Sequence, residues 1–91
     1  MISLDDLVAF SDRKPEVQAI AEHERMPTSM AAAFGRTLLQ AEDGPGRIRD
    51  MLIGVMRTAV RRRDVPQARH LVATLRGFLH EHPEARYRRA A

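Results

Sequence analysis

The chain has 91 residues, of which 44% are hydrophobic and 30% are charged, a balance typical of one soluble globular domain rather than a disordered chain. It has no cysteine, which excludes disulfides and thiolate metal sites. No apolar run approaches the ~18 residues of a membrane span. The first residues are acidic and do not resemble a secretory signal, so we expect a single cytoplasmic domain over 1–91 with no membrane contact.

Charge is divided unevenly along the chain. Residues 1–45 contain four basic and eight acidic residues, whereas residues 46–91 contain eleven arginines and four acids. Such asymmetry indicates either an acidic half folded against a basic half or a basic half that meets an anionic partner.

Short helices are expected in residues 1–26. Ser3 and Asp6 have the spacing of a capping box, and Pro15 suits the first turn of a second helix. Met26 stands before Pro27, and the residue before a proline avoids the helical region, so this helix should end there.

The helical core is expected over 29–81. A helix over 29–42 has Met30, Phe34 and Leu38 on one face, and it is followed by the breaker run 43–46. A central helix over 47–62 has an apolar arc of roughly 200°, broader than a peripheral helix needs, so neighbours on two sides are predicted. Asp64 should cap a last helix over 65–81.

The predicted fold class is all-α, a small bundle of four to five helices with a C-terminal antiparallel helical hairpin (47–62/65–81) and a basic tail over 83–91. The hairpin resembles a single tetratricopeptide-type unit at Asp64, Ala68 and Pro83. The large aromatic residue and the glycine of that family's first helix are absent, and only one unit is present. We therefore interpret the segment as a plain helical hairpin.

Arginines are the best candidates for a binding surface, because a guanidinium presents a planar fork to carboxylate or phosphate oxygens. They could equally form a solvated face, complement the acidic half, or favour the end of the helix dipole. A nucleic-acid surface often adds aromatic stacking, and only Tyr87 lies among these arginines. The candidate anion-binding or partner-binding residues are Arg57, Arg61, Arg62, Arg63, Arg69, Arg76, Arg86, Arg88 and Arg89.

Other chemistry finds little support in the sequence. His80 and His82 are two positions apart, so on a helix they point about 200° apart and cannot share a metal ion. No pattern indicates a catalytic site or a cofactor, and we expect neither. Phe34, Met51 and Met56 are the candidate seam for a homodimer or a protein partner. The sequence thus predicts a non-enzymatic adaptor, chaperone-like or regulatory protein, with nucleic-acid binding as the alternative.

Overall fold

The computed structural model describes residues 14–87 of the chain, which form four α-helices and one short 3-10 helix without a β-strand in that range. The helices are α2 (Pro15–Glu24), α3 (Thr28–Gln40), α4 (Gly44–Arg61) and α5 (Val65–Glu81), followed by η1 (Pro83–Tyr87). The all-α prediction is confirmed for these residues, while the helix predicted to start at Ser3 lies outside them. Within the same range, no helix is both long and apolar enough to cross a membrane.

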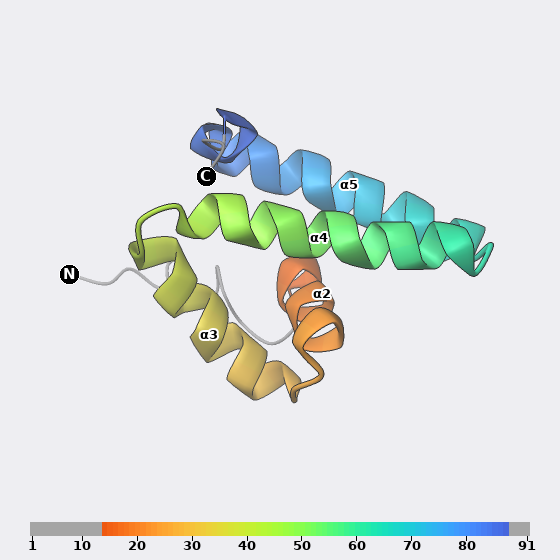
Figure 1. Ribbon diagram of the computed structural model, residues 1–91, viewed down its shortest axis with the longest axis horizontal. Coiled ribbons are helices and arrows are strands. Elements are labelled where there is room, and N and C mark those ends of the chain that lie inside the picture. Colours follow the sequence, from red (N-terminus) through yellow and green to blue (C-terminus); the bar gives the residue numbers. More distant parts are fainter. Residues whose placement is uncertain (1–13, 88–91) are drawn as a thin grey trace.

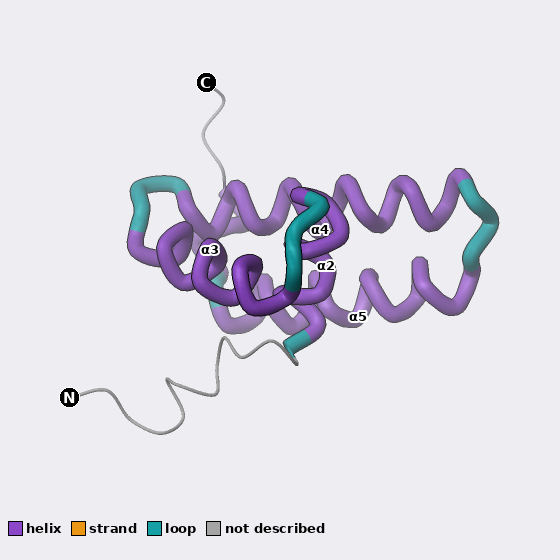
Figure 2. The backbone as a smooth tube through the Cα atoms, turned by 90° about the horizontal axis from the view of Figure 1, so that it is seen from below, coloured by secondary structure: helices purple, strands orange, loops and turns teal. Residues whose placement is uncertain are grey.

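The central position belongs to α4, as the broad apolar arc predicted. This helix packs against α2 and α3 and also against α5 and η1, and Figure 1 shows it between α5 and the α2–α3 pair. Its buried side chains include Ile48, Leu52 and Val55. Both views show α5 alongside α4, joined to it by the three residues Arg62, Arg63 and Asp64 (Figures 1 and 2).

The range of α5 agrees with the prediction, but the start of α4 does not. We expected residues 43–46 to form a turn and the helix to begin at 47, whereas α4 begins at Gly44. Pro45 fits there because a proline lacks only an N–H that the first helical turn leaves unbonded anyway. Asp43 makes the reversal itself, with a φ of 59°.

The predicted inner face of α3 is confirmed at Leu38 but wrong at Met30. Met30 is 59% exposed and Phe34 is half-buried, while Ala31, Ala32, Gly35 and Leu38 are buried. Three of these four residues, Ala31, Ala32 and Gly35, are small, so the α3 backbone can approach its neighbours closely along this face.

Two valines also depart from the predicted core. Val60 is 60% exposed and Val72 is 36% exposed, although each lies on an apolar stripe in the sequence. On α5 the buried residues are Leu71, Thr74 and Phe78, a face that leaves Val72 outside.

The start of the described chain lies beside the end of α5. The Lys14 Nζ is 3.4 Å from Glu81 Oε2 at the end of α5 and 3.9 Å from Glu16 Oε2 at the start of α2. The segment predicted as a basic tail is in part folded, because residues 83–87 form η1 and Ala85 is only 1% exposed within the core.

Candidate functional site: the arginine tip

The turn between α4 and α5 brings three consecutive arginines to one end of the molecule. Arg61 ends α4, Arg62 caps it, and Arg63 follows with a φ of 59°. The Arg63 N–H donates to the Val60 carbonyl (3.0 Å) and the Asp64 N–H donates to the Ala59 carbonyl (2.9 Å). This pair of bonds is the Schellman motif, which satisfies the last carbonyls of a helix.

Arg63 occupies a position that normally favours glycine. A side chain in the left-handed region costs about 1–2 kcal/mol because its Cβ crowds the backbone. The turn therefore holds a cationic side chain at some cost in conformational energy.

Asp64 is the one acid between residues 57 and 69, and it has a structural task. Its carboxylate accepts a hydrogen bond from the Gln67 N–H at 3.2 Å, so it caps the N-terminus of α5 as predicted. One oxygen of this carboxylate is thereby occupied within its own helix.

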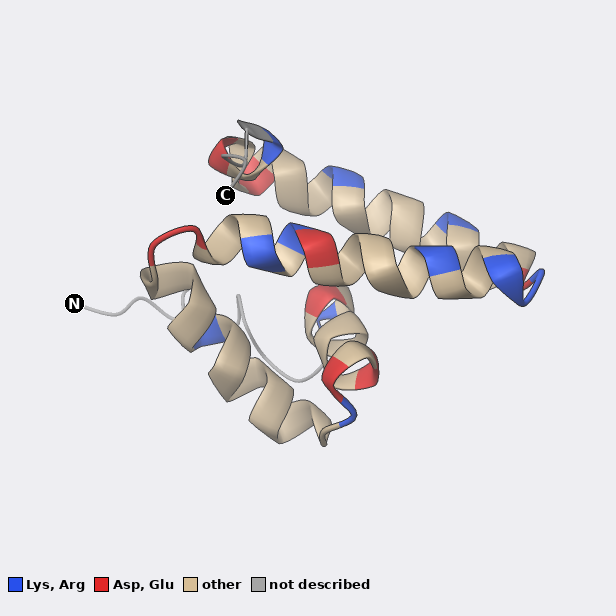
Figure 3. Ribbon diagram, in the orientation of Figure 1, with Lys and Arg blue, Asp and Glu red and all other residues tan. Residues whose placement is uncertain are grey.

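We call the exposed arginines around this turn the arginine tip. Within residues 14–87, the ion pairs found involve other cationic side chains, and none joins a tip arginine to a carboxylate. The Arg61 guanidinium instead donates to the Thr58 hydroxyl at 3.3 Å. Figure 3 shows the basic colour gathered where α4 ends. The members of the arginine tip are Arg57, Arg61, Arg62, Arg63 and Arg69.

The backbone adds little to the field at the arginine tip. The C-terminus of α4 has a partial negative charge and the adjoining N-terminus of α5 has a partial positive charge of similar size. Because the two ends lie at the same turn, their contributions largely cancel. The positive potential there comes from side chains.

The remaining candidate arginines lie elsewhere. Arg76 is two helical turns beyond Arg69 on α5, and Arg86 is in η1, beyond the other end of that helix. Arg88 and Arg89 lie outside the described residues. The structure thus brings together five of the nine candidates, extends the surface to Arg76, and separates Arg86 from it.

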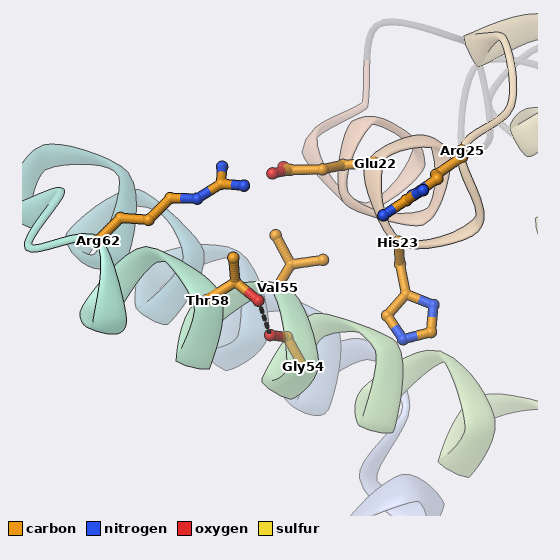
Figure 4. A pocket seen from close by; sticks show the side chains of 7 residues that line it. All are labelled: Glu22, His23, Arg25, Gly54, Val55, Thr58 and Arg62. Carbon is orange, nitrogen blue, oxygen red and sulfur yellow. Dashed lines mark hydrogen bonds between the residues drawn. The ribbon is translucent and has the colours of Figure 1, made fainter.

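A cleft of about 410 Å³ between α2 and α4 adjoins the arginine tip. Figure 4 shows Arg62 and Glu22 pointing toward each other across it, with Arg25 and His23 beyond Glu22. Gly54 makes room for the histidine, since a Cβ at this position would lie 3.3 Å from Cδ2 of His23. The residues that line the cleft are Glu22, His23, Arg25, Gly54, Val55, Thr58 and Arg62.

The cleft does not concentrate charge of one sign. Arg25 is the C-cap residue of α2, so it lies at the negative end of that helix dipole. Glu22 adds a full negative charge between Arg25 and Arg62 and also lines a smaller cleft, of about 200 Å³, between α2 and α5. Sequence reasoning missed both clefts, because their walls are about 30 or more residues apart and no spacing links them.

The predicted protein-contact seam is divided by the structure. Met51 is 6% exposed and belongs to the core, so this side chain is not available to a partner in the described fold. Phe34 and Met56 are half-buried against the core and remain a prediction.

His82, which follows the end of α5, forms local contacts. The His82 ring lies 4.7 Å from the Phe78 ring, and its Nδ1 is 3.5 Å from Glu84 Oε1. Among residues 14–87, no three His, Asp or Glu side chains are grouped as metal ligands.

Comparisons with protein-family models, with curated proteins and with solved structures gave no match. The argument for function therefore depends on the chain's own surface.

Proposed function

We propose that this chain is a small non-enzymatic interaction protein, of an adaptor or regulatory kind, that binds an acidic protein partner through the arginine tip. The observation that carries the proposal is the set of five exposed arginines that have no carboxylate partner among residues 14–87. Arginine is enriched at protein interfaces, where its fork pairs with carboxylates. The working unit is the hairpin in which α5 returns antiparallel to α4.

Two features favour a protein partner over a nucleic acid. Residues 57–69 contain no aromatic side chain on which a base could stack. Val60 and Val65, 60% and 53% exposed, flank the turn among the arginines. Apolar side chains with arginine around them suit a protein surface better than a row of phosphates. Nucleic-acid binding remains the alternative.

A homodimer that joins two arginine tips is disfavoured, because a symmetric interface would set like charges against each other. Self-association, if it occurs, is expected at Phe34 and Met56 on the α3 and α4 surfaces instead.

The test compares two double variants with the same net charge. Arg61→Gln/Arg63→Gln removes two charges from the arginine tip, and Arg47→Gln/Arg86→Gln removes two from elsewhere on the surface. Each is titrated with fluorescein-labelled poly-L-glutamate and with labelled single-stranded and duplex DNA, at low and high salt. Circular dichroism checks that both variants fold.

We expect the tip variant to bind poly-L-glutamate about tenfold more weakly than the wild-type chain and the control variant within about twofold of it. Equal losses in both variants would show attraction by net charge alone and would overturn the proposed site. Tighter, tip-dependent binding of DNA than of poly-L-glutamate would establish the nucleic-acid alternative.

A further inference from the structure

A line of alternating valines and arginines runs along the outer face of α5. Val65, Arg69, Val72 and Arg76 follow one another at spacings of four, three and four residues, which places them within one narrow face of a helix. All four side chains are exposed. We call this line the valine–arginine stripe.

The stripe lies away from the packed face of the helix. The core side of α5 consists of Leu71, Thr74 and Phe78. At about 100° per residue these three positions are well over 100° from the centre of the stripe. Neither valine is therefore exposed by a local defect in the core.

The stripe continues into the arginine tip. Val60 lies across the turn from Val65, and Arg57 is one helical turn before Val60 on α4. The large hydrophobic side chains that stand most exposed among residues 14–87 are Met30, Val60, Val65 and Val72. Val65 and Val72 belong to the stripe, and Val60 lies in the last turn of α4, just before the turn that joins the two helices.

Spacings of three and four residues are what a second helix contacts when it lies along the first, since its own side chains repeat with the same period. The stripe therefore fits a helix better than an extended segment. The arginines require that helix to be acidic. A second copy of α5 does not satisfy this requirement, because it would set Arg69 and Arg76 against arginines.

We infer that the valine–arginine stripe binds an amphipathic acidic helix of a partner protein. The apolar side chains of the partner helix contact Val65 and Val72, and the carboxylates of the partner helix pair with Arg69 and Arg76. This inference rests on the proposed function and names the shape of the partner, whereas the proposed function names only its charge.

The experiment uses two synthetic peptides of identical leucine and glutamate composition. In the amphipathic peptide the leucines repeat at spacings of four and three, and in the scrambled peptide they are distributed around the helix. Binding of each to the full chain is measured by calorimetry, together with that of poly-L-glutamate. The variants are Val65→Ser/Val72→Ser and, as the matched control for an exposed apolar side chain, Met30→Ser.

We expect the amphipathic peptide to bind at least about tenfold more tightly than the scrambled peptide. The double valine variant should abolish that difference and Met30→Ser should preserve it. If circular dichroism shows that the double variant is unfolded, changes in the amide NMR signals of the wild-type chain on adding the amphipathic peptide decide instead. The signals that change should be those of α5 residues between Val65 and Arg76.

Other outcomes overturn the inference in distinguishable ways. Equal binding of both peptides would leave the acidic partner in place but refute the helical shape. Absence of binding to either peptide and to poly-L-glutamate would refute the proposed function as well. Valine-dependent binding to phosphatidylserine-containing vesicles, without peptide binding, would identify the stripe as a lipid-binding surface.

Discussion

Replacing Met51 by alanine is expected to destabilise the fold far more than the same change at Met30. The sequence places both methionines on core-facing stripes, but Met51 is 6% exposed and Met30 is 59% exposed. Burying a methionine side chain contributes about 1.5–3 kcal/mol. With the cavity that truncation leaves, Met51→Ala should cost about 2–5 kcal/mol.

Met30→Ala should change the free energy of unfolding by no more than about 0.5 kcal/mol, since most of that side chain is already in water. The average per-residue stability gives a 91-residue domain about 5–14 kcal/mol in total. The loss at Met51 is therefore a large fraction of the whole.

Urea unfolding followed by far-ultraviolet circular dichroism measures the difference, because the chain is helical and has no tryptophan. The slope of free energy against urea should be the same in both variants if each unfolds in two states. Equal midpoints for Met51→Ala and Met30→Ala would refute the packing of α3 and α4 described above.

Substitutions at three positions, Gly44, Asp64 and Arg63, test the turns, with Gly77 in α5 as a control. Gly44→Ala should lower the free energy of unfolding by about 3 kcal/mol, because a Cβ there would overlap the Leu38 carbonyl group. Gly77 has open space around it, so Gly77→Ala should raise the free energy of unfolding by about 0.5–1 kcal/mol. Thermal unfolding measures both changes, and equal shifts would contradict the close approach at Gly44. Asp64→Ala should lower the free energy of unfolding by about 1 kcal/mol, because it removes the N-terminal cap of α5. Asp64→Asn should retain most of that stability in the same assay, since an asparagine side chain also caps a helix. Arg63→Gly should raise the free energy of unfolding by about 1 kcal/mol, because glycine adopts the left-handed backbone at this position without strain. The same variant should bind poly-L-glutamate more weakly. An unchanged affinity would show that Arg63 is not part of the arginine tip.

The helix boundaries that could be predicted from the sequence are those set by local chemistry. Asp64 and Pro66 define the start of α5, and His82 with Pro83 defines its end, because capping and proline geometry act within a few residues. Apolar patterning was less reliable. Thr74 reads as a polar residue, yet its hydroxyl donates to the His70 carbonyl at 2.9 Å, so its polar group is satisfied within its own helix and the side chain can be buried.

For the candidate site too, the sequence predicts local features and misses those that depend on distant helices. Arg61, Arg62 and Arg63 are consecutive, so the sequence shows that they meet at one turn. The cleft between Glu22 and Arg62 cannot be foreseen, because nothing local records which residues distant helices bring together. Neither does the sequence show that the tip arginines have no carboxylate partner among residues 14–87, since that depends on where the acids of α2 and of the turn between α3 and α4 come to lie.

The contact between Lys14 and Glu81, whose positions are 67 residues apart, has a consequence for the order of folding. Pairing of α4 with α5 closes a connection of only three residues, which costs little chain entropy. Contacts of Lys14 and α2 with α5 are far less local, Lys14 and Glu81 being 67 positions apart, and such non-local contacts form late. We therefore expect weakening of the contacts between α2 and α5 to accelerate unfolding while leaving the refolding rate almost unchanged.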